Sequence, residues 1–432
     1  MTAQQILRGI LAEALAAADP RAAVRRALSL RDGQGCVGDR AIEARRVVVL
    51  AVGKAAAGMA AAAVEIMGER VDGGLVVTKR GYDEDIPALR TLVAGHPEPD
   101  EGSRVAAIAV DRLAASLGEG DLLLALVSGG ASALLADVVG DITLGDLQVL
   151  SRDLLRSGAS IGEINAVRKH ISTLKGGGLV RRASPACVAA LLLSDVVGDD
   201  PATIGSGLTA PDPTTLADAL AVLQRHDLAA PSRIADYLAI APETPKPGDP
   251  LFDDATSVIV GSGRLSAQAA AGAARERGYA PLILSTSMAG TAAELGRMHA
   301  AIVREVLASG QPVSAPCALI SGGEATVVVR GAGPGGPNQE FALAVALELQ
   351  GVAGWAAFAA DSDGADGPTD AAGGLVDGTT TTSIRAQGLD PDAALANNES
   401  YLALDAVGAL LRIGPTGTNV NDIRVVLIDD NK

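Results

Sequence analysis

Residues 46–67, RVVVLAVGKAAAGMAAAAVEIM, decide the fold class of this chain. A run of apolar, largely β-branched residues leads into a glycine turn, and an alanine-rich segment follows. This is the pattern of a buried strand, a tight turn and a helix. Similar patterns recur at residues 121–138, 256–278 and 316–329. The repetition predicts an α/β protein with mainly parallel or mixed sheets.

The length of 432 residues exceeds what one hydrophobic core usually organises, and we expect two domains. The proline-rich stretch APETPKPGDP, residues 241–250, is the best candidate boundary, because proline extends the chain and lacks the amide donor that a sheet needs. Beyond it the strand and turn patterns begin again. We therefore predict an N-terminal domain over 1–240, a linker over 241–252 and a C-terminal α/β domain over 253–432.

The formal net charge of -16 argues against nucleic acid and anionic membrane surfaces as partners, because both would repel the protein. No stretch approaches the ~20 apolar residues that span a bilayer. The N-terminus lacks the basic start and apolar core of a signal peptide, and three scattered cysteines form no zinc or disulfide pattern. We expect a cytoplasmic enzyme, with a homodimer left open.

Lysine is scarce, and its positions are therefore informative: six of the 35 basic residues are lysines. Lys54 follows Gly53 in a strand-end turn, where a helix N-terminus and an ammonium group suit an anion. The segment is not a Walker loop, because Val48 and Ala55 stand where the motif needs glycine and a hydroxyl. The alternative is that Lys54 is an ordinary solvated lysine of a turn, and the residues alone leave both interpretations open.

The segment INAVRKHISTLKGGGL, residues 164–179, clusters cations in an acidic protein. The structural interpretation of this segment is an amphipathic helix with a basic, solvated face. Its functional interpretation is a ligand site, because the three glycines after Lys175 allow the backbone to approach a ligand closely.

Two acidic motifs follow apolar runs that read as strands. Ser194 and Asp195 come at the end of one such run, where open α/β sheets carry catalytic side chains. DSDGADGPTD, residues 361–370, fails the calcium-loop pattern at three positions. We expect Asp361 and Asp363 to bind Mg²⁺ shared with substrate phosphates, while turn capping explains Asp366 and Asp370 at least as well.

The segment GAGPGGPNQEFALA, residues 331–344, matches G-x-G-x-x-G before a helix. No acidic residue follows at the distance that a dinucleotide ribose requires. The match therefore favours an anion-binding turn over a nicotinamide site, with a purely structural turn as the alternative.

Taken together, these segments resemble the class II glycerate kinases, some members of which are named hydroxypyruvate reductase. The resemblance covers nearly the full length and rests on eight motifs in the same order. They are AVGKAAAGMA (51–60), GHPEPDEGS (95–103), VSGGASALL (127–135), INAVRKHIST with LKGGGL (164–179), SDVVGDDPATIGSGLTAPDPTT (194–215), GGEATVVV with GPGGPNQEFALA (322–329 and 333–344), DSDGADGPTDAAGG (361–374) and GPTGTNVNDI (414–423).

The resemblance implies two α/β domains, the first Rossmann-like, with the active site in the cleft between them. It also implies transfer of the γ-phosphoryl group of ATP to D-glycerate, giving 2-phosphoglycerate, with ATP and Mg²⁺ required. The expected catalytic residues are Lys54, Asp195 as the base that helps deprotonate the substrate hydroxyl, Arg168 and Lys175. The expected substrate- and nucleotide-binding residues are Gly53, His96, Ser128, Gly129, Gly130, Ser132, Asn165, Lys169, Gly322, Gly323, Glu324, Gly335, Gly336, Asn338, Gln339, Glu340, Thr418 and Asn419.

One position departs from the family pattern: Pro337 stands where many relatives have arginine in Gly-Gly-Arg-Asn-Gln-Glu. Either another cation, such as Arg168, Lys169, Lys175 or Arg330, replaces that arginine, or this branch works differently. Two rival functions follow from these observations. One is an NAD(P)H-dependent hydroxypyruvate reductase, and the other is a non-catalytic binder of sugar acids.

Overall fold

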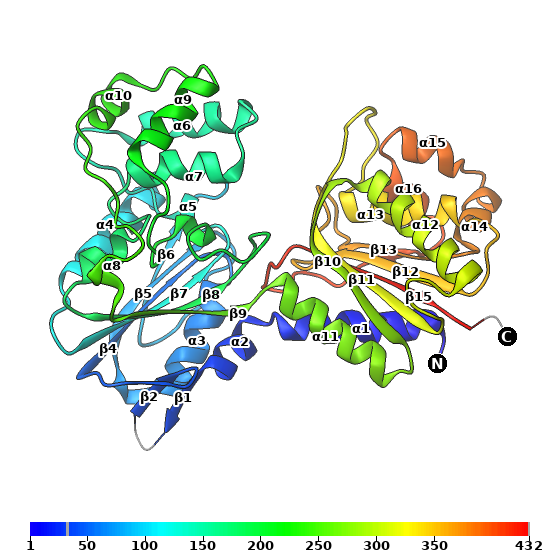
Figure 1. Cartoon of the computed structure of the whole chain (residues 1–432), viewed down its shortest axis with the longest axis horizontal. Helices are drawn as coiled ribbons and strands as arrows, with labels where there is room; N and C mark the ends of the chain where they lie inside the picture. Colours follow the sequence, from blue (N-terminus) through cyan, green and yellow to red (C-terminus); the bar gives the residue numbers. More distant parts are fainter. Residues whose placement is uncertain (32–33, 431–432) are drawn as a thin grey trace. The chain divides into compact units, whose positions relative to one another are not determined.

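The computed structural model describes residues 1–31 and 34–430, which form two compact units (Figure 1). We call residues 20–260 the parallel unit, and residues 1–19 with those from 261 onward the mixed unit, after their sheets. Among the described residues, no helix has the length and apolarity to cross a membrane. The predicted α/β class is confirmed.

The parallel unit is built on a six-stranded sheet in the order β6-β5-β4-β7-β8-β9. Numbered along the chain, this is the order 3-2-1-4-5-6 of dinucleotide-binding folds, with its reversal point between β4 and β7. The pairings among β4 to β8 are parallel. The strands are β4 (Arg46–Val52), β5 (Val71–Lys79), β6 (Arg90–Ala94), β7 (Asp121–Ser128), β8 (Cys187–Leu193) and β9 (Ala255–Gly261).

Helices cover this sheet, and the central strand β7 is buried along its whole length. That burial explains the continuous apolar run in its sequence, because a parallel strand covered on both faces has no solvent side. The helices packed near the sheet are α2 (Pro20–Ala27), α3 (Ala56–Met67), α4 (Glu101–Ala115), α5 (Ala131–Leu134) and α8 (Gly178–Ala183). A small antiparallel sheet joins β1 (Leu28–Arg31), β2 (Gln34–Val37) and β3 (Arg40–Ile42).

Four further helices of this unit share a separate apolar core. They are α6 (Leu144–Arg156), α7 (Ile161–His170), α9 (Leu216–Arg225) and α10 (Ser232–Leu238), and Figure 1 shows them together in green and cyan beyond the sheet. Ser160 and Glu163 form a capping box that begins α7, each side chain bonding the other's backbone amide.

The mixed unit has a sheet in the order β10-β11-β15-β12-β13-β14. β10 and β11 are parallel, whereas the remaining pairings are antiparallel. The strands are β10 (Ala280–Thr291), β11 (Cys317–Thr326), β12 (Trp355–Asp361), β13 (Gly373–Asp377), β14 (Leu410–Leu411) and β15 (Asp422–Ile428).

Alternate residues of these strands enter two different cores, as the period of two requires. Ala356 and Phe358 pack with helices α1 and α11, whereas Trp355 and Ala357 pack on the side of α12 and α13. The helices of this unit are α1 (Ala3–Ala17), α11 (Gly263–Glu276), α12 (Ala292–Ser309), α13 (Pro337–Glu348), α14 (Thr380–Ala386), α15 (Pro391–Ala396) and α16 (Ser400–Asp405).

The units differ from the domains predicted over 1–240 and 253–432 at both ends. Helix α1 belongs to the mixed unit, because Leu7, Ile10 and Leu11 bury their side chains against the alanine-rich face of α11. Strand β9 continues the parallel sheet, so the unit ends at residue 260. The predicted linker 241–252 is part of this unit too, and its Phe252 packs against the parallel-sheet core.

Candidate active site

The ends of β4 and β7 meet at the reversal point of the parallel sheet, where ligands of open α/β folds bind. Two hydrogen bonds join the turns: the Lys54 amide donates to the Gly129 carbonyl at 2.9 Å, and the Ala55 amide donates to Ser128 Oγ at 3.0 Å. Gly53 has φ of +128°, and a Cβ there would lie 2.2 Å from Ser128 Oγ. The approach of the two turns therefore requires glycine at this position.

Three predicted side chains gather around the two glycines of the second turn. A Cβ at Gly129 would lie 1.9 Å from Asp195 Oδ2, and a Cβ at Gly130 would lie 3.0 Å from His96 Cδ2 and 3.4 Å from Lys54 Cγ. We call Lys54, His96, Gly129, Gly130 and Asp195 the switch-point cluster. Its two glycines leave the space that a carboxylate, an imidazole and an ammonium chain occupy.

The charges of this cluster suit proton transfer next to an anion. Burial raises the pKa of Asp195, and the nearby Lys54 charge opposes that rise. Burial, followed by the charges of Lys54 and Lys79, lowers the pKa of His96 to about 4. His96 is therefore neutral near pH 7 and only a weak proton acceptor, so the cluster combines a carboxylate, a weakly basic imidazole and the Lys54 side chain.

The two predicted lysines of the 164–179 segment are held by buried carboxylates. Lys169 Nζ lies 3.1 Å from Asp212 Oδ1. Lys175 Nζ forms an ion pair with Asp137 and donates to the Leu135 carbonyl at 2.7 Å. These contacts give both ammonium groups a structural partner within the fold, so neither is an open cation of the kind the sequence suggested.

The three glycines after Lys175 also serve packing. A Cβ at Gly177 would lie 2.6 Å from the Phe252 ring, and one at Gly178 would lie 2.2 Å from the Thr173 carbonyl oxygen. The predicted close approach exists, but its partner is the chain itself.

Asn165 and Ser132 belong to a hydroxyl chain that connects α7 to the β7–α5 turn. Ser206 Oγ donates to Asn165 Oδ1 at 3.0 Å and lies 2.6 Å from Ser132 Oγ. Because Ser206 has one proton, Ser132 donates to Ser206 and keeps its own lone pairs available. The predicted residues Asn165 and Ser132 are thus brought together, through a serine that sequence reasoning did not select.

In the mixed unit, the glycine-rich loop before α13 packs against its own chain. A Cβ at Gly335 would lie 2.4 Å from Ser400 Oγ, and a Cβ at Gly336 would lie 2.4 Å from Asp366 Oδ2. Asp366 also accepts hydrogen bonds from the amides of Asn338 and Gln339, at 3.0 and 2.8 Å. The helix N-terminus predicted as an anion site is therefore capped by this carboxylate.

The other predicted residues of this unit are mostly engaged in packing. Gly323 has φ of +121°, and a Cβ at Gly323 or Gly322 would meet the neighbouring strands β10 or β15. Glu324 is exposed at the strand end. The remaining four residues form hydrogen bonds within the unit. Glu340 Oε2 accepts from Asn398 at 3.2 Å, and Gln339 donates to Thr369 at 2.7 Å. Thr418 donates to the Ala18 carbonyl at 2.7 Å, and Asn419 Oδ1 accepts from the Asn421 amide at 3.0 Å.

The predicted metal ligands Asp361 and Asp363 lie in consecutive side-chain turns at the end of β12. Asp361 Oδ1 accepts from the Asp363 amide at 3.0 Å, and Asp363 Oδ1 accepts from the Ala365 amide at 2.9 Å. Burial and the Asp363 charge raise the pKa of Asp361 to about 8. Such a crowded pair of hard oxygen donors fits Mg²⁺ chemistry, although the residues described here include no group of three or more His, Cys, Asp or Glu side chains able to hold a metal.

Sequence reasoning missed a buried polar group beside these carboxylates. Asp422 Oδ1 accepts from Asn338 Nδ2 at 2.6 Å, and Asp422 also pairs with the fully buried Arg424. Within the described part of the chain, Arg424 Nε and Nη1 have no hydrogen-bond partner. The available signal was the Asp-x-Arg spacing in a strand, which places both side chains on one face.

Comparisons with known proteins agree with this arrangement. Residues 6–239 match the family described as "Domain of unknown function (DUF4147)", and residues 317–422 match the MOFRL family. The chain is 45% identical to a D-glycerate 2-kinase of Thermotoga maritima, covering 89% of this chain and 91% of that protein. It is 43% identical to a putative hydroxypyruvate reductase of Agrobacterium vitis, covering 99% of this chain and 95% of that protein.

A crystal structure of a glycerate kinase from Thermotoga maritima superposes with a TM-score of 0.90 at 41% identity, covering 98% of this chain and 99% of that one. Similarity of this extent, in sequence and in structure, includes both units. The chain therefore belongs to the glycerate 2-kinase family.

Proposed function

We propose that this protein transfers the γ-phosphoryl group of ATP to the 2-hydroxyl of D-glycerate, giving 2-phosphoglycerate and ADP. The observation that carries the proposal is the placement of Asp195 and Lys54 at the reversal point of the parallel sheet, in a chain of the glycerate 2-kinase family. A base and a cation side by side are the elements that phosphoryl transfer to an alcohol requires.

In the proposed reaction, the Asp195 carboxylate accepts the proton of the 2-hydroxyl group. The hydroxyl oxygen forms a bond to the γ-phosphorus, and the bond from that phosphorus to the β,γ-bridging oxygen breaks. Lys54 lies where its ammonium group can neutralise negative charge on the transferring group. His96, whose pKa is lowered to about 4, is a weak base near pH 7 and can orient the substrate by hydrogen bonding.

Asp361 and Asp363 are the proposed ligands of Mg²⁺. When bound, this ion supplies positive charge to the phosphate oxygens of ATP. The two carboxylates contribute hard oxygen donors, and because burial and the Asp363 charge raise the pKa of Asp361, binding of a divalent cation would release a proton from this pair.

Because Pro337 stands where many relatives have arginine, another cation must take its place in the proposed reaction. The ion pairs within the fold narrow the candidates. Lys169 and Lys175 are neutralised by buried carboxylates, whereas Lys54 and Arg168 have no ion pair within the described part of the chain. We propose that Lys54 is the principal cation at the transferring phosphoryl group.

Phosphorus NMR of the purified protein with Mg²⁺, ATP and D-glycerate tests this function, because it identifies the product without coupling enzymes. We expect a 2-phosphoglycerate signal that Lys54→Ala abolishes. A 3-phosphoglycerate signal would correct the regiochemistry, and the absence of any phosphorylated product would reject the kinase.

The reductase alternative has little structural support. The glycines of its supposed dinucleotide loop are explained by contacts with residues 397–400 and Asp366. Incubation with NADH or NADPH and hydroxypyruvate should therefore give no change of absorbance at 340 nm.

A further inference from the structure

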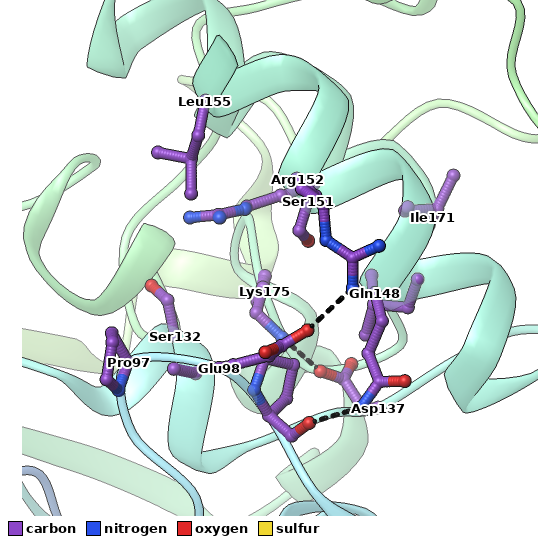
Figure 2. A pocket seen from close by; sticks show the side chains of 14 residues that line it. Pro97, Glu98, Ser132, Asp137, Gln148, Ser151, Arg152, Leu155, Ile171 and Lys175 are labelled. Atoms are coloured by element: carbon purple, nitrogen blue, oxygen red, sulfur yellow. Dashed lines mark hydrogen bonds and ion pairs between the residues drawn. The ribbon is translucent and has the colours of Figure 1, made fainter.

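A cavity of about 190 Å³ lies within the parallel unit, next to the switch-point cluster. The loop after β6 and helix α5 line one side of it, and helices α6 and α7 line the other (Figure 2). Its apolar walls include Pro97, Leu147, Leu155 and Ile171. Sites for small organic molecules commonly combine such apolar walls with a few polar groups that fix the orientation of the ligand.

Most of the charged side chains that line this cavity already have partners. Lys175 is paired with Asp137, and Arg152 Nη2 lies 3.0 Å from Glu98 Oε1; dashed lines in Figure 2 mark both pairs. The exception is the guanidinium of Arg168, which is partly buried and has no hydrogen bond or ion pair with any residue that the structure describes. A partly buried guanidinium without a counter-ion in the fold is a suitable binding group for an anion.

Two connections link the neighbourhood of Arg168 to the switch-point cluster. Asn165 and Arg168 are three residues apart on α7 and so share a face. Asn165 is bound through Ser206 to Ser132, which lines the same cavity and follows Gly130 by two residues. Another wall residue, Pro97, directly follows His96. The cavity and the switch-point cluster are therefore neighbours along the chain at two places, the loop after β6 and the start of α5.

The lining distinguishes between the two anions of the proposed reaction. A triphosphate carries several charges and would need several cations or a metal, whereas this cavity offers one unpaired guanidinium between apolar walls. The single negative charge of a three-carbon acid equals the single positive charge of the Arg168 guanidinium. A planar guanidinium can also bind both carboxylate oxygens.

We propose that Arg168 binds the carboxylate of the acceptor acid, with Ser132 Oγ accepting a hydrogen bond from a substrate hydroxyl. Arg168 is then the residue that makes the enzyme select a hydroxy acid over a neutral polyol. This inference rests on the proposed function for the identity of the acid, D-glycerate.

The test is calorimetric binding of D-glycerate without nucleotide, together with steady-state kinetics, for the wild type and Arg168→Gln. We expect Arg168→Gln to weaken D-glycerate binding about 10- to 100-fold, because it removes a charged hydrogen-bond partner. The KM for D-glycerate should rise with it, while kcat and the KM for ATP change less than about threefold. Discrimination against neutral glyceramide should fall by a factor close to the loss in glycerate affinity.

Two variants control this experiment. Arg156→Gln removes an exposed arginine of α6 outside the cavity lining and should leave both substrates' KM values unchanged. Arg168→Lys keeps the charge but loses the paired geometry, so we expect an intermediate affinity; it also replaces Arg168→Gln if that variant fails to fold.

Other results would overturn the inference. Unchanged D-glycerate affinity with a higher KM for ATP would assign Arg168 to the nucleotide, and a loss of kcat alone would assign it to the transition state. A wild type that binds D-glycerate without phosphorylating it would reject the proposed function while still allowing the Arg168 test. A wild-type protein that neither binds nor phosphorylates D-glycerate would reject both the proposed function and the role of Arg168.

Discussion

A methyl group at Gly129 would lie 1.9 Å from Oδ2 of Asp195, so the backbone of the β7–α5 turn rests directly against the proposed base. Gly129 does not have a positive φ, and the demand for glycine here is one of space. The Asp195 carboxylate can therefore occupy its position only because Gly129, at the end of the neighbouring strand β7, has no side chain.

Gly129→Ala should displace the Asp195 carboxylate and lower kcat/KM by about 100-fold, since a misplacement of about 1 Å has that order of effect. The measurement is steady-state kinetics with D-glycerate. Gly118→Ala is the matched control, because a Cβ at Gly118 meets nothing within 4 Å. Equal activities for the two variants would show that Asp195 is not held by this contact.

The pH dependence of kcat/KM should report the ionisation of Asp195. A base must be unprotonated, so activity should fall as the pH falls through its pKa, which burial raises above the usual range for aspartate. Lys54 opposes that rise, and Lys54→Met should therefore move the acidic limb of its residual activity to higher pH. We expect this variant to lose about 100- to 1,000-fold in kcat.

His96 should contribute no limb between pH 5 and 8, because burial and neighbouring charges lower its pKa to about 4. His96→Asn is the control and should retain the acidic limb at its wild-type position. Disappearance of that limb in His96→Asn would transfer the role of base from Asp195 to the imidazole.

Lys175→Met should act chiefly on stability. It would leave the buried Asp137 carboxylate without its cation, which costs about 3–5 kcal/mol. Burial alone would raise the pKa of Asp137, but Lys175 and surrounding hydrogen bonds hold it below its usual range. The stabilisation is therefore complete above the unfolded pKa of aspartate and is lost as the pH falls through the lower folded value.

Urea unfolding at pH 7 and at pH 3 measures this effect, and the difference between the wild type and Lys175→Met should shrink at the lower pH. Lys54→Met has no ion pair to break in the described structure and should unfold close to the wild type. A Lys175→Met protein of normal stability and no activity would restore the catalytic role predicted from sequence.

The two acidic positions Asp363 and Asp366 should respond differently to substitution. Asp363→Asn should raise the half-saturating Mg²⁺ concentration by about tenfold or more, because it removes a proposed ligand. Asp366→Ala should instead lower stability by about 1–2 kcal/mol, since its carboxylate caps the first amides of α13. Magnesium titration of activity and thermal unfolding separate the two effects. A normal magnesium response in Asp363→Asn would remove it from the proposed metal site.

The sequence by itself determined the fold class and the strand ends at which we propose that the chemistry occurs. Strands and helices were predictable because their apolar periods are local, and the glycine turns after β4 and β7 followed directly from those runs. Lys54 and Asp195 were predictable for the same reason: each follows a buried strand, and parallel strands bring their ends to one edge.

Tertiary structure decided which charges are available. Lys175 meets Asp137 across 38 residues of sequence and Lys169 meets Asp212 across 43, so no local pattern distinguishes them from Arg168, whose side chain meets no partner in the described parts of the chain. The unit boundary was equally non-local, because α1 is buried on a helix more than 240 residues away. Hydrophobic periodicity depends only on residues close together in the sequence. The pairing of buried charges depends instead on which distant segments the fold brings into contact.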